Sequence, residues 1–384
     1  MPIETEAWFI YPHAIGQENK RAELVREPLT IADLAEDEVL AEPIYGSWEG
    51  NLKHAIEGRP VDVCRQRGEK RVVLGNAGAL RVLEVGDAVT TVKPGQRAIL
   101  FPAGVVDRFG YPKLIYGYDA PRTIGCFARR LKCGQYHVVP IPDDTRHSID
   151  RWAAFSAKAS TAWSNWELAH GALRLLLHHD ELPAPHVWGW GGGTALSQLH
   201  LARLHGCKPV MMTSDERRAD TIRRTGVTPL DRRPFQELSY DEQRVARDRA
   251  YRRRYMDAES VFLKTVREMT DGEMVHIFID NIGTPVFRAT LKALSREGIL
   301  TTVGWGAGKE MSYLRASECI FRRQFIHTHF ARYEQGVAAV AYAEANDWLP
   351  IVDDRYSYDE IPLVAERVFQ GALGVNTVYS VNPE

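Results

Sequence analysis

This chain of 384 residues has few cysteines and no long apolar run. The five cysteines are scattered and lack Cys-x-x-Cys spacing, which argues for reduced thiols and against a disulfide framework. No apolar stretch approaches membrane-spanning length, and the N-terminus lacks the pattern of a signal peptide. The formal net charge of −2 gives no reason to expect binding to nucleic acid or a membrane surface. We therefore expect a cytoplasmic protein.

Several catalytic signatures are also missing. The sequence contains no Gly-x-Ser-x-Gly nucleophile motif and no Walker A lysine. Histidines cluster loosely, but no ligand set at zinc spacing emerges, so we expect no metal. Polarisation of a carbonyl or an alkene would then depend on hydrogen-bond donors.

The stretch 186–218 contains the clearest functional pattern. A short apolar strand leads into a glycine-rich turn, an amphipathic helix and a second apolar strand. Glycines let backbone N–H groups approach a pyrophosphate, and the positive end of the helix dipole faces the same anion. Strand, turn and helix follow in the order that the motif requires, so we predict a dinucleotide site. Its first residues are Gly189, Trp190, Gly191, Gly192, Gly193 and Thr194.

The residues after the second strand indicate which dinucleotide binds. Ser214 comes first, and Arg217 and Arg218 follow within reach. A hydroxyl together with guanidinium groups suits a 2′-phosphate, which favours NADPH. Asp215 and Glu216 are more simply interpreted as first-turn residues that complement the dipole of the next helix. The alternative is that both arginines lie on a solvated helix face.

The pattern of turns divides the chain into two domains. Short apolar segments punctuated by Gly and Pro run to about residue 155, which is typical of a compact, barrel-like domain. Strands and helices then alternate to about residue 329, which indicates a parallel, doubly wound sheet. We predict an α/β protein with a β-rich domain over 1–157 and 337–384 and an inserted Rossmann domain over 158–336.

One charged segment does not belong to a minimal Rossmann domain. Residues 235–267 are helical in character and rich in arginine. One interpretation is a solvated insertion helix. The other is a phosphate-contacting surface for a bulky substrate such as a coenzyme A ester.

This organisation resembles the medium-chain dehydrogenase/reductase superfamily, in which a Rossmann domain is inserted into a GroES-like β-rich domain. The VKPGQRA turn at 92–98 contributes to the likeness. Zinc-dependent members carry Gly-His-Glu where this chain has Gly75-Asn76-Ala77, so the resemblance implies a zinc-independent protein. Within the superfamily the chain is most similar to the crotonyl-CoA reductase/carboxylase branch. The segments that carry this likeness, besides the charged insertion, are 58–63, 115–121, 214–218 and 328–331.

The resemblance implies an NADPH-dependent reductase of an α,β-unsaturated acyl thioester, carried by coenzyme A or an acyl carrier protein. Many members of the branch also add carbon dioxide, using an asparagine, a Phe-Glu pair and a histidine. Asn51 matches the asparagine, whereas Tyr118-Asp119 and Asn281 stand at the other positions. The changed carboxylate and the lost imidazole imply reduction without carboxylation.

Candidate roles follow from the residue types. Asp119 lies in a loop, where it can donate a proton to the α-carbon or merely cap a turn. Tyr118 can donate a hydrogen bond to the thioester carbonyl. Asn281 follows an apolar strand and is expected at its carboxyl end, where ligands bind in open α/β sheets. Gly304 and Trp305 follow the next strand and are expected to face the same crevice.

The substrate side is expected to include Trp48 and His329, although a hydrogen-bonded core histidine is the alternative for His329. The superfamily resemblance implies a homodimer or homotetramer. Two other functions stay open. One is a zinc-independent, NADPH-dependent ketone or alcohol dehydrogenase of specialised metabolism, and the other is a non-catalytic NADPH-binding protein.

Overall fold

The computed structural model describes residues 2–12, 21–59, 61–304, 307, 310 and 314–383. The chain folds into two compact units, one formed by 1–161 and 330–384 and the other by 162–329. Helix α3 (Ile149–Leu176) carries the chain from the first unit into the second. None of the described helices is long and apolar enough to span a membrane.

The first unit is rich in β-structure. One sheet has the strand order β2-β1-β4, and a larger one has the order β10-β6-β5-β3-β18-β17, with β9 also paired to β3. β7 and β8 form a separate antiparallel pair. These strands are β1 (Ile3–Ile10), β2 (Val25–Ile31), β3 (Glu38–Ser47), β4 (Val72–Val73), β5 (Gly78–Val85), β6 (Arg97–Leu100), β7 (Ala103–Val106), β8 (Pro112–Ile115), β9 (Leu131–Gly134), β10 (Val138–Pro140), β17 (Asp354–Ser357) and β18 (Thr377–Ser380).

Short helices connect these strands. α1 and α2 both end at a glycine in the left-handed conformation, Gly58 and Gly68, which suits the C-terminal cap of a helix. The helices are α1 (Gly50–Glu57), α2 (Val63–Arg67), α9 (Tyr333–Asn346) and α10 (Ile361–Phe369), with 3₁₀ turns η1 (Gln135–His137) and η4 (Tyr358–Glu360).

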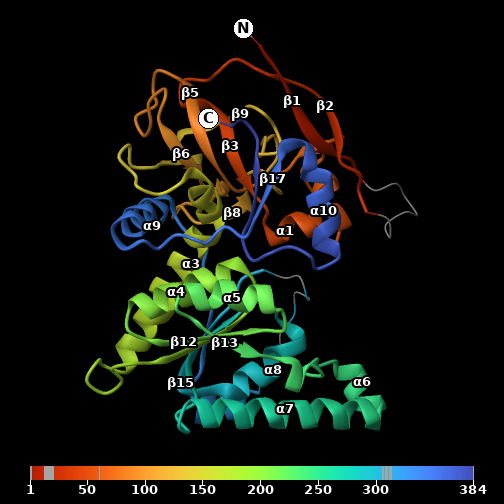
Figure 1. Ribbon diagram of the computed structural model, residues 1–384, viewed down its shortest axis with the longest axis vertical. Helices are drawn as coiled ribbons and strands as arrows, with labels where there is room; N and C mark the ends of the chain where they lie inside the picture. Colours follow the sequence, from red (N-terminus) through yellow and green to blue (C-terminus); the bar gives the residue numbers. More distant parts are fainter. Residues whose placement is uncertain are drawn as a thin grey trace. The chain divides into compact units, whose positions relative to one another are not determined.

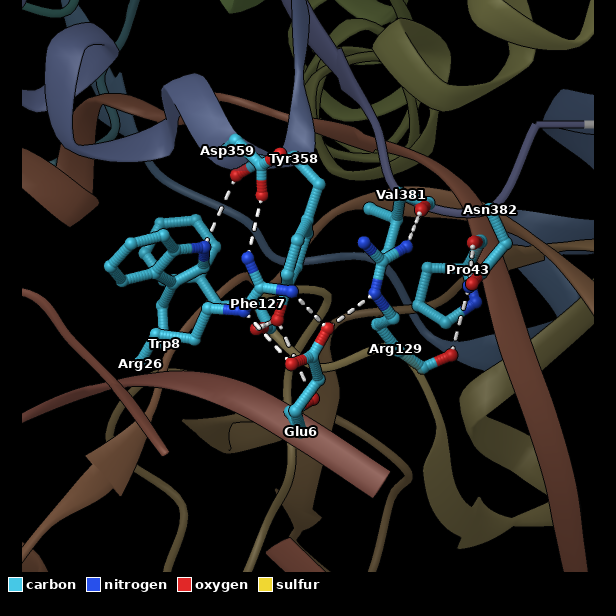
Figure 2. A network of polar contacts seen from close by, with 10 residues as sticks. All are labelled: Glu6, Trp8, Arg26, Pro43, Phe127, Arg129, Tyr358, Asp359, Val381 and Asn382. Atoms are coloured by element: carbon cyan, nitrogen blue, oxygen red, sulfur yellow. Dashed lines mark hydrogen bonds and ion pairs between the residues drawn. The ribbon is translucent and has the colours of Figure 1, made fainter. Parts of the chain in front are cut away.

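An ion-pair network joins the two stretches of chain that build the first unit (Figure 2). The Glu6 carboxylate on β1 accepts hydrogen bonds from Arg26 on β2 and from Arg129. Arg26 also donates to Asp359 at 2.7 Å, and Arg129 donates to the Val381 carbonyl at 2.6 Å. The hydrogen bonds that Glu6 accepts from Arg26 and Arg129 lower the pKa of its carboxyl group, and the bond from Arg26 has the larger effect. The network therefore fastens the returning C-terminal stretch to the N-terminal strands.

The second unit contains a sheet in which every described pairing is parallel, with the strand order β13-β12-β11-β14-β15-β16. This confirms the predicted doubly wound sheet. The order reverses at β11, which pairs with β12 on one side and β14 on the other. Ligands of such sheets bind at the carboxyl ends of the strands, at this reversal. The strands are β11 (His186–Trp190), β12 (Lys208–Thr213), β13 (Thr228–Asp231), β14 (Val275–Asp280), β15 (Leu294–Thr301) and β16 (Phe325–His327).

Helices cover both faces of this sheet, with α4 and α5 on one face and α7 and α8 on the other (Figure 1). The charged insertion forms α6 and α7. Tyr255, Phe262 and Val266 of α7 are buried in the hydrophobic core, whereas its arginines 252–254 are exposed. Exposure fits both interpretations of these arginines. The elements are η2 (Arg233–Phe235), α4 (Gly193–Leu204), α5 (Glu216–Arg224), α6 (Glu242–Arg247), α7 (Arg249–Met269), α8 (Thr284–Ala293) and the π-helical segment η3 (Arg315–Phe321).

Candidate functional site

The glycine turn after β11 leads directly into α4. Gly191 has a φ of 137°, a conformation that L-residues with a side chain rarely adopt. Gly192 is the exposed N-cap of α4, and a Cβ atom there would meet nothing within 4 Å. Gly193 and the half-buried Thr194 begin the helix. The first N–H groups of a helix lack acceptors within it, so this turn offers backbone donors and open space to an anion.

The other glycines allow close packing. A Cβ atom on Gly189 would lie 3.1 Å from Leu199 Cδ1, so this glycine lets α4 approach β11. A Cβ atom on Gly191 would lie 3.0 Å from the Cβ of Asn281. Gly191 therefore lets the Asn281 side chain lie directly against the turn.

Trp190 is the main departure from the sequence prediction, which placed it among the nucleotide-binding residues. Its side chain is 2% exposed and packs against the rings of Phe262 and Phe278, with centroids 5.3 and 6.1 Å away. Its indole Nε1 donates to Thr290 Oγ1 at 3.0 Å. The last residue of a fully buried parallel strand points into the core here, so the side chain lines the core, and contact of the Trp190 backbone with a nucleotide stays a prediction.

The residues predicted to bind the ribose follow β12. Asp215 is the N-cap of α5 and its side chain accepts from the Arg218 N–H at 2.9 Å, whereas Glu216 lies in the first turn, as expected of a residue that complements the helix dipole. Ser214 and Arg217 are exposed and Arg218 is half-buried. All lie at the carboxyl end of the strand next to β11, and their contact with a nucleotide stays a prediction.

Asn281 joins the ends of three neighbouring strands. Its backbone N–H donates to the Trp190 carbonyl at 3.2 Å, and its side-chain Oδ1 accepts from the Val303 N–H at 3.1 Å. It therefore lies at the carboxyl edge of the sheet, as expected. Gly304 is exposed and has a φ of 82°. Trp305 lies outside the described residues.

His329 follows β16 and is held through its backbone. Asn165, buried on α3, donates to the His329 carbonyl at 2.6 Å and accepts from its N–H at 3.2 Å. Thr301 at the end of β15 donates to the same Asn165 side chain at 2.8 Å. Sequence reasoning missed Asn165, because a single amide in a long helix carries no motif.

A buried ammonium organises the turn between β3 and α1 in the first unit. Lys158 on α3 donates to Glu49 at 2.7 Å, to Ser47 Oγ at 2.8 Å and to the Trp48 carbonyl at 3.2 Å. Burial raises the pKa of Glu49, against the opposing effect of Lys158. Sequence reasoning missed this group as well. The available signal was a lysine within the small, apolar sequence AAFSAKAS.

Trp48 and Asn51 lie on this turn and on α1. Trp48 is 5% exposed, and its ring lies 5.9 Å from that of Phe127, so it belongs to the core of the first unit. Asn51 is half-buried. The predicted contact of either residue with a substrate stays a prediction.

Asp119 caps a turn, which was the alternative to a role in proton transfer. Its Oδ1 accepts from the Ile115 N–H at 2.6 Å, and burial raises its pKa. The neighbouring Tyr118 is 3% exposed, and burial raises the pKa of its phenol as well. Tyr118 therefore keeps its proton at neutral pH and can act as a hydrogen-bond donor.

Buried polar atoms without a hydrogen-bond partner in the described part of the chain occur in both units, among them Trp188 Nε1 and Gln198 Nε2 in the second. Such a group costs about 1–3 kcal/mol unless water or a ligand satisfies it. Of the residues that carry these atoms, Trp48, Tyr118 and Tyr379 share one hydrophobic core. Five of the atoms in the first unit are Trp48 Nε1, Asn51 Oδ1, Asn76 Oδ1, Tyr118 Oη and Tyr379 Oη, which we call the unpaired polar group.

Two other kinds of site are less well supported. A cavity of about 730 Å³ in the first unit is lined in part by Glu6, Arg26, Arg129 and Asn382 of Figure 2. Carboxylates of its lining pair with arginines, as Glu6 does with Arg26 and Glu42 with Arg81. Among the described residues, no group of three or more His, Cys, Asp and Glu side chains could hold a metal ion.

The sequence was compared with known protein families and with known proteins. No protein-family model matches the chain. It is 23% identical over 331 residues to a crotonyl-CoA reductase of Streptomyces avermitilis, which is 83% of this chain and 71% of that protein. The chain is related to the crotonyl-CoA reductases. This confirms the resemblance inferred from the sequence.

Solved structures show the same fold. The crotonyl-CoA carboxylase/reductase AntE in complex with NADP has a TM-score of 0.80 at 20% identity, covering 99% of this chain and 95% of that one. The 2-octenoyl-CoA carboxylase reductase CinF, in complex with NADP and 2-octenoyl-CoA, has a TM-score of 0.79 at 19% identity, covering 99% and 88%. The predicted α/β fold class is therefore confirmed.

Proposed function

We propose that this protein is an NADPH-dependent reductase of an α,β-unsaturated acyl thioester, and that it does not carboxylate its product. The observation that carries the proposal is the open glycine turn at the N-terminus of α4, beside Asn281 at the carboxyl edge of the sheet. Relatives solved with NADP, one of them also with an enoyl-CoA, support the choice of cofactor and substrate class.

NADPH fits the residues of the second unit. The backbone donors of Gly192 and Gly193 would hold the pyrophosphate, and Ser214 with Arg217 would hold the 2′-phosphate. The bound cofactor supplies a hydride, which suits attack on the β-carbon of an enoyl thioester.

The first unit would hold the thioester. Tyr118 keeps its proton and donates a hydrogen bond to the thioester carbonyl, which stabilises the negative charge that develops on that oxygen. Asp119, held by the Ile115 N–H, positions this turn, and solvent supplies the proton of the α-carbon. Asn281 has no imidazole to take part in proton transfer, which supports reduction without carboxylation.

The carrier and the assembly are also proposals. We propose a coenzyme A ester as the substrate, by similarity with CinF, and a homodimer in the cytoplasm. Of the described strands, β13 and β16 form the two edges of the sheet, and Phe325 of β16 is 39% exposed, which supports pairing with a second copy. Analytical ultracentrifugation tests the assembly.

Oxidation of NADPH, followed by its absorbance with a series of enoyl-CoA and enoyl-carrier-protein substrates, tests the function. We expect turnover with at least one enoyl thioester and no dependence on bicarbonate. Turnover only with ketones or aldehydes would favour the dehydrogenase alternative. Tight NADPH binding without turnover on either series would favour a non-catalytic binding protein.

A further inference from the structure

A chain of buried hydrogen bonds runs behind the glycine turn. Trp190 Nε1 on β11 donates to Thr290 Oγ1 on α8 at 3.0 Å. The Thr290 hydroxyl lies 3.0 Å from Asp280 Oδ2 and can donate to it. Thr290 and Asp280 are fully buried and Trp190 is 2% exposed. The chain thus connects one strand end to the next through a helix.

Asp280 also bonds to the loop that follows β14. Its other oxygen, Oδ1, accepts from the N–H groups of Ile282 at 3.0 Å and Gly283 at 2.9 Å. Gly283 is the N-cap of α8 and has a φ of 91°, so the loop turns sharply here. The Asp280 carboxylate thus holds the backbone of Ile282 and Gly283 in this short turn, and Asn281 lies between Asp280 and these two residues.

Asn281 connects this chain of hydrogen bonds to the glycine turn, where a ligand would lie. Its backbone N–H bonds to the Trp190 carbonyl, and its Cβ lies against Gly191 in the turn. The side-chain Oδ1 is held by the Val303 N–H, which orients the amide. Its Nδ2 makes no hydrogen bond within the described part of the chain.

We propose that Trp190, Thr290 and Asp280 are positioning residues that hold Asn281 for contact with the bound NADPH. The proposal rests on the proposed cofactor. It explains why a bulky tryptophan stands inside a glycine-rich turn. The indole N–H must reach Thr290, and a small residue could not fill the space between Phe262 and Phe278. A buried polar chain of this kind specifies one arrangement because each member would be left unpaired in another.

The affinity for NADPH, measured by titration of nicotinamide fluorescence, tests the proposal without any substrate. Thr290→Val removes the central hydroxyl and keeps the volume. Trp190→Phe removes the N–H and keeps an aromatic ring. We expect each to raise the Kd about 3–10-fold, as the loss of one or two hydrogen bonds implies. Thr290→Ser, which keeps the hydroxyl, should restore affinity.

A double-mutant cycle separates positioning from general damage to the core. In an Asn281→Ala background, Thr290→Val should cause no further loss of affinity, because the chain would have nothing left to position. Phe235→Leu disturbs the same aromatic core, where the Phe235 ring makes an edge contact with Trp190 at 6.2 Å, but it removes none of the hydrogen bonds of the chain. It should lower the melting temperature and leave the Kd unchanged.

The outcomes distinguish this proposal from the proposed function. If the unaltered protein fails to bind NADPH, the proposed cofactor is wrong. If it binds NADPH, and Thr290→Val and Trp190→Phe bind it equally well, the positioning chain is wrong. Equal losses in the presence and absence of Asn281 would also overturn it, as would an equal loss in Phe235→Leu.

Discussion

Two clusters of buried polar groups, one in each unit, differ in how they are bonded, although each unit also contains buried polar atoms without a partner among the described residues. Around the glycine turn of the second unit, Trp190, Thr290, Asp280 and Asn281 bond to one another or to backbone groups. In the first unit, the unpaired polar group lies among apolar side chains. The difference teaches that the polar groups behind the glycine turn are satisfied by internal hydrogen bonds, whereas the unpaired polar group leaves donors and acceptors that water or a ligand can satisfy.

Among the buried polar groups of the first unit, the Lys158 ammonium makes three hydrogen bonds, and breaking this cluster should give the largest effect. Lys158→Met leaves the Glu49 carboxyl buried without its partner and should lower the free energy of unfolding by about 3–5 kcal/mol. Lys93→Met, which breaks the exposed Lys93–Asp143 pair, should cost about 0–1 kcal/mol. Urea denaturation measures both. Equal losses would show that the buried pair does not organise this turn.

Substitution in the glycine turn tests whether the open space there holds an anion. Gly192→Ala adds a Cβ that meets nothing in the protein, so stability should change little. The methyl group would enter the space of the pyrophosphate, and we expect the NADPH Kd to rise by about tenfold or more. Gly171→Ala in α3, where a Cβ also meets nothing, is the matched control and should leave the Kd unchanged. An unchanged Kd in Gly192→Ala would contradict the site.

Arg217 tests the choice between NADPH and NADH. Arg217→Ala should weaken NADPH binding by about tenfold, because a charge-assisted bond to the 2′-phosphate is lost, and should change NADH binding little. Arg224→Ala, exposed at the other end of α5, is the control. Isothermal titration with both nucleotides measures the ratio. A parallel loss for both nucleotides would place the arginine away from the 2′-phosphate.

Acid should weaken the second unit gradually. Burial, with a smaller effect of His186, lowers the pKa of His276 to about 4, and its Nδ1 accepts from the His186 N–H. The neutral form is favoured on folding, so its contribution is complete above about pH 6.5 and is lost as the pH falls towards 4. Lys208, Glu273 and Arg174 also act on this group. Unfolding free energies of His276→Asn between pH 4 and 7 should show a shallower decline, and identical declines would count against this assignment.

Sequence patterns predicted the second unit better than the first. The apolar run 275–280 predicts a buried strand and forms β14 with the same bounds. The spacing of apolar residues over 152–177 predicts a helix, which the structure has as α3. Buried strands and long helices have strong periodicity, which is why these succeeded. The helices α1 and α10 and the strands β2 and β17 were not predicted, because short elements have little periodicity and depend on tertiary packing.

The candidate site shows the same limit. The spacing of the glycines predicts the turn, because the positive φ of Gly191 is a local backbone conformation that favours glycine. The direction of the Trp190 side chain depends on α7 and α8, which come later in the chain, so the turn sequence alone could not reveal it. The Lys158 cluster joins residues 109–111 positions apart and has no local signature.

Transfer of deuterium from the nicotinamide of labelled NADPH to an enoyl-CoA tests the central claim most directly. Mass spectrometry of the product, with and without bicarbonate, is the measurement. The account predicts a saturated acyl-CoA with one deuterium at the β-carbon and no added carboxyl group in either condition. Absence of deuterium from every acyl product, in a protein that binds NADPH, would contradict it.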